Sequence, residues 1–384
     1  MTTAPARFID VHIVQSLPYS NVNRDDLGSP KTVTFGGTTR TRVSSQAWKR
    51  PTRLAVEAAI GERAVRTRRL PLQIQHDLVA RGWPEELART AGEQVIISTG
   101  ELGLDKKTPM NSASLIFLPE PAAQRLADIA EEHREALEKA LGGSAAEKKA
   151  AAKGVLPKDE VQKVLRSSNG SIALFGRMLA EIPGAGVDGS VQVAHAFTTH
   201  TTSVQADFFT AVDDEDRWAE DAGSGHMNTA EYSSGVFYRY ATLDLRDLAA
   251  NVDDPATARE LTEAFLNSFI TSMPSAKKNS TAPHTIPDLV HVAVRSDRPV
   301  SLAAAYEKPV TAGRDGWSST SRDALAQYAT IASQLLGTSG LLHRAWAGLD
   351  TAGTDGLGGR AGSFTELVTR AVAAATSKDK DTAA

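Results

Sequence analysis

The spacing of apolar and polar residues predicts that the chain begins with β structure. Across residues 8–14, apolar positions alternate with the polar residues Asp10 and His12, which is the two-residue period of a half-buried strand. Residues 31–43 carry strand-like segments on both sides of Gly36-Gly37, and they predict a hairpin because glycine adopts the positive φ of a tight turn. Further strands are predicted at 191–197, 233–245 and 289–294, which are rich in apolar and β-branched residues.

A helical period governs most of the remaining sequence. It begins at 44–69, where Pro51 either kinks the helix or occupies its first turn. Residues 73–179 are mostly helix-prone and are expected to form a helical insertion. Ser363 and Glu366 have the spacing of a capping box, which predicts the start of a final helix. Other helices are predicted at 121–141, 145–153, 255–272 and 322–336.

The order of these elements predicts the fold class. About 35 residues between two predicted strands, 198–232, show no clear period, and a hairpin excursion of this length is usually functional. Split strands with helices crossing between them, a large helical insertion and a protruding hairpin predict an α+β fold with a core of ferredoxin-like type.

Composition narrows the possible functions. With 41% hydrophobic and 23% charged residues, the chain is expected to fold. The absence of cysteine excludes disulfides, thiolate nucleophiles and Cys-ligated zinc, and we predict neither a cofactor nor a metal. No apolar run resembles a signal sequence or approaches the roughly 20 residues that cross a bilayer. The expected location is therefore cytoplasmic, with no membrane partner.

The net charge of −4 conceals a local basic patch. Between residues 24 and 53, seven basic residues stand against the two acids Asp25 and Asp26. Ser44, Ser45 and Gln46 add neutral donors where the predicted strand gives way to a helix, whose first N–H groups favour anions. The stretch predicts a phosphate site; the alternative is a solvated basic corner in which the acids form ion pairs. The basic residues are Arg24, Lys31, Arg40, Arg42, Lys49, Arg50 and Arg53.

Other segments are candidates for nucleic-acid contact. Phe208 and Phe209 lie in the long excursion, and their rings either stack on bases, worth about 1–3 kcal/mol per base, or pin the excursion to protein. Lys277 lies with Lys278 between a predicted helix and strand and offers a second basic contact. Lysines in a helical region either attract a duplex backbone or form a solvated surface; they are Lys148, Lys149, Lys153, Lys158 and Lys163.

Several features suggest catalysis or metal binding only weakly. His195 and His200 are five positions apart and would point to opposite faces of a continuous strand, which disfavours a shared metal, although His226 is free to approach either. The acidic run 213–216 lacks the spaced ligands of a calcium loop and is expected to be a solvated turn. The glycine-rich segment 356–362 lacks the Lys-Ser/Thr of a phosphate loop and is expected to be a linker.

Short motifs occur in order along most of the chain. They are NRDD (23–26), FGG (35–37), RVSSQAWKR (42–50), GRM (176–178), VDGSVQVAHAFTTH (187–200), DFFTAVDD (207–214) and SSGVFYRYA (233–241). The segment PVSLAAAYEKPV (299–310) extends this ordered set. Each motif is weak alone, but the ordered set resembles one family, CasC, the backbone subunit of the type I-E CRISPR Cascade surveillance complex.

The resemblance implies an RRM-like palm at 1–60 and 185–384, a helical finger domain inserted at 61–184, and a β-hairpin thumb at 200–232. It implies a subunit that is not an enzyme, binds CRISPR RNA, and assembles with further copies of itself and with other Cascade subunits to present guide bases to target DNA. Met178 and Phe209 match residues that flank a flipped base, and Lys148, Lys149 and Lys153 correspond to a surface that meets target DNA. The predicted RNA-binding residues are Arg24, Lys31, Arg42, Ser44, Ser45, Gln46, Lys49, Arg50, Arg53, Met178, Phe208, Phe209 and Lys277.

Two alternatives remain open from the residues. The first is an RNA endonuclease on the same scaffold, with Asp25 or Asp26 acting at a metal or with a histidine acting as general acid or base. The second is an RNA-binding module that works as a monomer.

Overall fold

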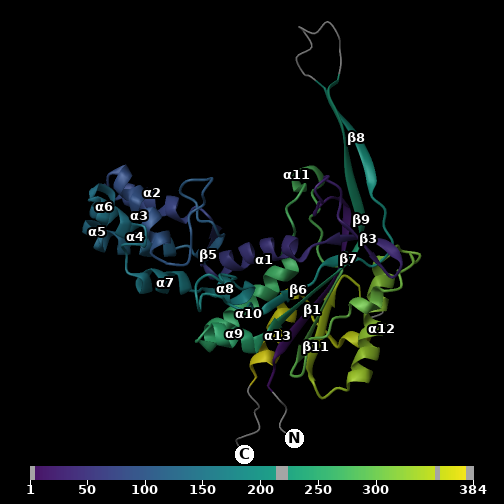
Figure 1. Cartoon of the computed structure of the whole chain (residues 1–384). Coiled ribbons are helices and arrows are strands. Elements are labelled where there is room, and N and C mark those ends of the chain that lie inside the picture. Colours follow the sequence, from purple (N-terminus) through teal and green to yellow (C-terminus); the bar gives the residue numbers. More distant parts are fainter. Residues whose placement is uncertain (1–4, 213–223, 351–354, 378–384) are drawn as a thin grey trace, which may run out of the picture. The chain divides into compact units, whose positions relative to one another are not determined.

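The computed structural model describes residues 5–212, 224–350 and 355–377. The chain divides into two compact units (Figure 1). The first unit comprises residues 1–56, 191–246 and 258–384, and the second comprises residues 57–190 and 247–257. Most of the second unit is therefore an insertion in the sequence of the first.

The first unit is built on a large, mostly antiparallel sheet. Its strand order is β12-β11-β10-β1-β9-β7-β3-β2, and β6 and β8 also pair with β9. β1 lies between β10 and β9 and is antiparallel to both. The strands are β1 (Phe8–Ser20), β2 (Thr32–Phe35), β3 (Thr38–Val43), β6 (Val191–Val193), β7 (Ala196–Thr198), β8 (Gln205–Val212), β9 (Ser224–Asp244), β10 (Leu289–Arg295), β11 (Leu341–Gly348) and β12 (Gly359–Arg360).

Helices pack on both faces of this sheet. On one face, Val14 and Tyr238 join a core that includes Leu325 of α12. On the other, Leu17 packs with Trp48 of α1. The helices of this unit are α1 (Ser45–Ile60), α10 (Pro255–Thr271), α11 (Lys278–Thr281), α12 (Ser318–Leu336) and α13 (Phe364–Thr376), with short turns η2 (Ala303–Tyr306) and η3 (Asp355–Leu357); α1, α10 and α9 (Leu245–Asn251) each carry residues of both units.

The prediction that β1 is half-buried is wrong, because helices cover the sheet on both sides. Asp10 and His12 are almost fully buried. Asp10 accepts hydrogen bonds from the hydroxyl of Tyr240 and the N–H of Val300, both at 2.9 Å, while His12 Nδ1 lies 2.9 Å from the hydroxyl of Tyr238. These bonds offset the cost of burying polar groups in the sheet.

The long excursion is a hairpin, as predicted, and we call the β8–β9 hairpin the arm (Figure 1). Residues 224–232 of β9 pair with β8, whereas residues 233–244 pair with β1. One continuous strand therefore belongs to both the arm and the central sheet. The predicted acidic run 213–216 lies outside the described residues.

The second unit is mainly helical. Its only paired strands among the described residues are β4 and β5, which form an antiparallel pair. Apolar residues of α2, α3, α4, α5 and α7 form one core. Its elements are β4 (Ala64–Thr67), α2 (Leu70–Ala80), α3 (Glu85–Ile97), β5 (Ile116–Pro119), α4 (Ala122–Glu132), α5 (Arg134–Gly142), α6 (Ala145–Ala151), α7 (Lys158–Arg166) and α8 (Gly170–Phe175).

Several predicted boundaries are corrected by local backbone geometry. The helix expected at 44–69 ends at Ile60, and Gly61 follows with φ +69°. Pro51 lies inside α1 rather than in its first turn. His133 separates the single helix expected at 121–141 into α4 and α5, and the strand expected at 191–197 is divided into β6 and β7.

The predicted start of the last helix is half correct. The hydroxyl of Ser363 accepts the N–H of Glu366 at 3.1 Å, as in a capping box. The carboxylate of Glu366, however, accepts the N–H of Gly362 at 2.7 Å rather than that of the capping residue. Among the helices in the described part of the chain, none combines the length and apolar character that a bilayer crossing requires.

Candidate functional site

The NRDD segment forms a turn that is fixed to the start of α1. One carboxylate oxygen of Asp25 accepts the N–H groups of Leu27 (3.0 Å) and Ser29 (2.9 Å). The side-chain oxygen of Asn23 accepts the N–H of Ser44 at 2.8 Å. Asp25 therefore shapes the turn, and Asn23, which the sequence analysis did not single out, connects that turn to the helix.

A cluster of basic side chains lies where β3 meets β7. Arg42 lies opposite Phe197 in this pairing, and its Nη1 is 2.8 Å from Nδ1 of His195. Burial, followed by the charges of Arg42 and Lys31, lowers the pKa of His195. A neutral His195 accepts the Arg42 hydrogen bond through Nδ1. Lys31, Arg42 and His195 thus form one cluster; sequence reasoning placed the two cations in a phosphate site but considered His195 only as a metal ligand or catalytic group.

Helix α1 continues this cluster with a stripe of polar side chains. Gln46, Lys49, Arg50 and Arg53 are spaced by three, four and seven positions, which places them on one helical face. Gln46 and Arg50 are exposed, whereas Lys49 is partly buried and burial lowers its pKa. With Ser45 in the first turn, the predicted phosphate-binding residues of α1 share one surface.

The first turn of α1 is held against the sheet by a buried arginine. The guanidinium carbon of Arg239 lies 3.7 Å from the ring centroid of Trp48. Arg239 donates to the side-chain oxygen of Gln15 (2.6 Å) and to the carbonyl of Phe269. Burial lowers the pKa of Arg239 to about 9. Sequence reasoning missed this residue, although an arginine among the apolar and aromatic residues of 235–241 was the available signal.

Arg40 does not belong to the surface patch in which the sequence placed it. Its side chain is fully buried. Nη1 donates to the carbonyl of Thr198 (2.9 Å), Nη2 donates to that of Tyr306 (3.0 Å), and Nε donates to the hydroxyl of Thr38 (3.0 Å). Arg40 therefore joins β3 to β7 and η2, and it offers no charge to a ligand.

The Gly-Gly turn between β2 and β3 predicts a measurable difference between its two glycines. Gly36 has φ +59°, and a Cβ there would lie 1.6 Å from the carbonyl oxygen of Glu307. Gly37 has φ +74° but open space around it. We expect Gly36→Ala to lower the free energy of unfolding by about 2–4 kcal/mol, and Gly37→Ala by about 1 kcal/mol. Urea denaturation measures both, and equal losses would contradict the close contact with Glu307.

A groove at the base of the arm brings together residues from three distant segments. It has a volume of about 460 Å³ and is lined by Arg24, Phe209 and Lys277, among others. Glu231 on its wall accepts a hydrogen bond from the hydroxyl of Ser29. Phe209 is 41% exposed. Two cations and an aromatic ring on one groove suit a nucleotide, since the cations contact phosphate and the ring stacks on a base.

The remaining predicted contact residues lie elsewhere. Phe208 is 65% exposed and, as the strand neighbour of Phe209, points to the other face of the arm. Met178 is 90% exposed and belongs to the second unit, on a groove that Arg66 also lines. Lysines 148, 149 and 153, on and just after α6, are exposed in the same unit. Their roles stay predictions.

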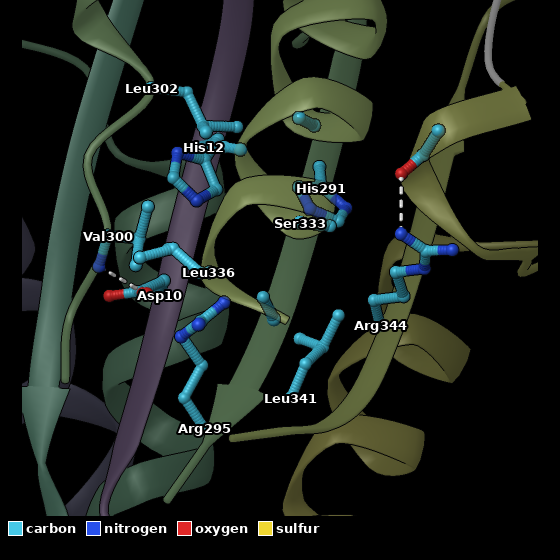
Figure 2. A pocket seen from close by; sticks show the side chains of 14 residues that line it. Asp10, His12, His291, Arg295, Val300, Leu302, Ser333, Leu336, Leu341 and Arg344 are labelled. Atoms are coloured by element: carbon cyan, nitrogen blue, oxygen red, sulfur yellow. Dashed lines mark hydrogen bonds between the residues drawn. The ribbon is translucent and has the colours of Figure 1, made fainter. Parts of the chain in front are cut away.

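A small polar cavity lies between α12 and the sheet of the first unit, on the face opposite to α1 (Figure 2). Asp10, His12, His291 and Arg295 line it. Its volume of about 20 Å³ accommodates about one water molecule, so it is too small for a nucleotide or peptide. Burial raises the pKa of Asp10 to about 6 and lowers that of His291 to about 4; it also lowers the pKa of His12.

These groups predict that the protein loses stability as the pH falls from about 6.5 to about 4. His12 and His291 stay neutral in the folded protein, whereas in the unfolded chain each binds a proton below about pH 6.5. For each histidine, the free energy of unfolding therefore falls by about 1.4 kcal/mol for every pH unit below that value. Asp10 opposes this loss between pH 3.8 and about pH 6, because over that range its carboxyl group is protonated in the folded protein but not in the unfolded chain. Two histidines outweigh one carboxyl group.

Urea unfolding at a series of pH values tests this expectation. The His291→Gln variant should show a shallower loss of stability on acidification than the unsubstituted protein. A stability that stays constant or rises as the pH falls would contradict the assignment of neutral buried histidines.

Hydrogen bonds to the backbone hold the ring of His200 in place. His200 donates from Nδ1 to the carbonyl of Thr201 (2.9 Å) and accepts the N–H of Val236 at Nε2 (3.1 Å). Both of its ring nitrogens are therefore engaged. In the described part of the chain, one group of side chains could hold a metal ion: Glu132, His133 and Glu160, whose ligand atoms lie within 4.8 Å of one another. This group contains no residue of the NRDD turn.

Comparison with known proteins identifies the family. The fold is that of an α+β protein built on a large, mostly antiparallel sheet. Residues 9–370 match the family of CT1975-like proteins, and the chain belongs to that family. None of the curated proteins matches the chain.

Two solved structures are similar to the chain over nearly its full length. A chain of a structure described as "CRISPR RNA-guided surveillance complex, pre-nicking" is 46% identical with a TM-score of 0.89, and the similarity covers 96% of this chain and 100% of that one. A chain of a second, described as "CRISPR RNA-guided surveillance complex", is 40% identical with a TM-score of 0.79, covering 96% of this chain and 99% of that one.

Proposed function

We propose that this protein is a backbone subunit of a CRISPR surveillance complex of type I-E, in which several copies bind along one CRISPR RNA. Family membership and the two similar structures, described as RNA-guided surveillance complexes, support the proposal. The observation that carries the role of this chain is the concentration of Lys31, Arg42 and the α1 stripe around the junction of β3 and α1. Such a surface suits the negatively charged backbone of RNA.

Each part of the fold has a role in this proposal. Residues 1–60 and 185–384 form an RRM-like palm that holds the RNA, and residues 61–184 form the fingers. Residues 200–232, whose described part includes β8, form the thumb, which reaches the next copy and flips out a base. The partners are CRISPR RNA, further copies of the chain, target DNA and other Cascade subunits, in the cytoplasm and without a membrane.

The chemistry of the palm explains how one protein serves any guide. Side chains that bind phosphate and ribose fix the position of the RNA without reading its sequence. The bases remain available to pair with target DNA, so base pairing supplies the specificity. The role is non-catalytic, in accord with an Asp25 carboxylate that shapes its own turn and a His200 whose ring nitrogens are both hydrogen-bonded.

Assembly on RNA tests the proposal. Light scattering of the protein with guide RNAs of increasing length should show a mass that grows by whole subunits as the RNA lengthens. The increments should be independent of RNA sequence, because the contacts are to the backbone. A protein that stays monomeric on every RNA would refute the filament and favour the single-module alternative.

A cleavage assay tests the rival endonuclease. Incubation of the assembled complex with complementary RNA and a divalent metal should leave the RNA intact. Cleavage at regular spacing that Asp25→Ala abolishes would overturn the non-catalytic role, and Asp25→Asn serves as a matched variant that keeps a side-chain oxygen for the turn.

The arm predicts a specific effect on the bound RNA. We expect Phe209→Ala to leave the salt dependence of RNA binding unchanged and to remove the periodic chemical reactivity of flipped bases, because the ring contacts a base rather than phosphate. Target-DNA binding should fall by the loss of about 1–3 kcal/mol per stacked base. Phe209→Leu is the matched apolar control, and unchanged reactivity in the alanine variant would refute the wedge role.

A further inference from the structure

We propose that the second unit carries a separate duplex-DNA-binding surface on and beside β4. It comprises Arg66, Arg68, Arg69, Lys106 and Lys107, and we call it the β4 surface. The inference rests on the proposed function, which it deepens by naming the residues through which this unit meets the phosphate backbone of a target. These residues are distinct from the lysines on and after α6.

Two carboxylates near this surface are already engaged. Glu120 forms an ion pair with Arg63 at 3.0 Å. Asp105 lies 3.9 Å from Arg68, and the charge of Arg68 and two backbone N–H groups lower the pKa of its carboxyl group, with the N–H groups contributing most. Neither carboxylate is therefore free to neutralise the other cations.

The remaining cations of the β4 surface are exposed and form no ion pair among the described residues. Arg66 lies on β4 and Arg69 lies immediately before α2. Lys106 and Lys107 lie in the loop between α3 and β5. Clustered like charges repel one another, so a surface that keeps four unpaired cations together suits a polyanion.

Hydrogen bonds fix the conformation of the loop that carries the two lysines. A side-chain oxygen of Asp105 accepts the N–H groups of Lys107 (2.7 Å) and of the next residue (3.2 Å). The N–H of Ser112 donates to the carbonyl of Arg68 at 2.7 Å, which joins the loop to the arginines. Met110 is buried at 8% exposure with φ +63°, a conformation that non-glycine residues adopt only when their surroundings require it.

The chemistry of the surface favours a duplex over a single strand. Proteins that bind single strands offer exposed aromatic rings on which bases stack. Arg66 covers the ring of Phe117, which is only 4% exposed, with its guanidinium carbon 4.9 Å from the ring centroid. Cations without a stacking ring suit a continuous phosphate backbone, where affinity comes from the release of counterions.

Salt dependence of duplex binding by the full-length protein tests the inference. The probe is a fluorescent DNA duplex of unrelated sequence, titrated from about 50 to 200 mM salt. The variant Arg66→Gln/Arg69→Gln/Lys106→Gln/Lys107→Gln should lower the slope of log K against log salt by about three to four units, since each phosphate contact contributes about 0.9. An unchanged slope would overturn the proposal and favour an acidic protein as the occupant.

Smaller variants keep the result interpretable. Lys106→Gln/Lys107→Gln alone, at two exposed loop positions, should lower the slope by about two units. Arg63→Gln should have little effect, because that arginine is ion-paired. If Lys148→Gln/Lys149→Gln/Lys153→Gln removes the slope and the β4 variants do not, the duplex binds at α6 and the inference fails.

The test also separates this inference from the proposed function. The variant Lys106→Gln/Lys107→Gln, whose two positions lie outside the groove that Arg66 shares with Met178, should assemble on guide RNA like the unsubstituted protein. If the unsubstituted protein does not assemble on RNA, the proposed function fails, whereas the duplex slope of the free chain still decides whether the β4 surface binds DNA.

Discussion

The variant Lys31→Ala/Arg42→Ala/Lys49→Ala is expected to bind guide RNA on the order of a thousandfold or more weakly than the unsubstituted protein. Each replacement removes a charged donor from the surface around β3 and α1, and hydrogen bonds to charged groups contribute about 1.5–3 kcal/mol. The slope of log K against log salt should fall by about two units, since each contact to a single strand contributes about 0.7. The loss should be the same for guides of unrelated sequence.

A variant of equal charge controls for net electrostatics. Arg63→Ala/Arg89→Ala/Arg134→Ala removes three positive charges from arginines of the second unit that form ion pairs with glutamates. It should leave the slope nearly unchanged. If both triple variants lose RNA affinity equally, binding depends on overall charge and the palm surface has no special role.

The second large effect concerns the buried arginine beneath α1. We expect Arg239→Ala to lower the free energy of unfolding by about 3–4 kcal/mol, because it leaves a cavity against Trp48 and removes the donors that bind Gln15 and the carbonyl of Phe269. Arg239→Met fills much of the same volume without a buried charge, and its loss should be clearly smaller.

Thermal and urea denaturation measure these differences, and RNA binding by the methionine variant adds a second result. If Arg239 also positions Trp48 and the first turn of α1, a stably folded Arg239→Met protein will bind guide RNA more weakly, with the salt slope retained. Equal stability of the alanine and methionine variants would contradict the packing role.

Local chemistry made some elements predictable from the sequence. The hairpin around Gly36-Gly37 and the cap at Ser363 depend on residues a few positions apart, so the sequence contains their causes. The sequence predicted the arm as a hairpin but not the extent of its two paired strands, because its polar residues show no alternation with apolar ones. Motif order, rather than periodicity, led to the family.

The faces of the sheet were not predictable, because they depend on segments far apart in sequence. The pattern at 8–14 gives a strand, but η2 and α12, about 300 residues later, cover the side on which Asp10 and His12 lie. Arg40 and Arg42 have the same spacing as any exposed pair on a strand. Arg40 is buried only because the carbonyls of Thr198 and Tyr306 come together around it.

The shared strand β9 has a consequence for how the protein can evolve. Its 21 residues span a length of about 70 Å, and the strand continues from the central sheet into the arm without interruption. Inserting one residue between these two halves would exchange the sides on which Phe208 and Phe209 project, since side chains alternate along a strand. Changes of two residues preserve the sides and alter only the reach, so length variants of this protein should differ here by even numbers.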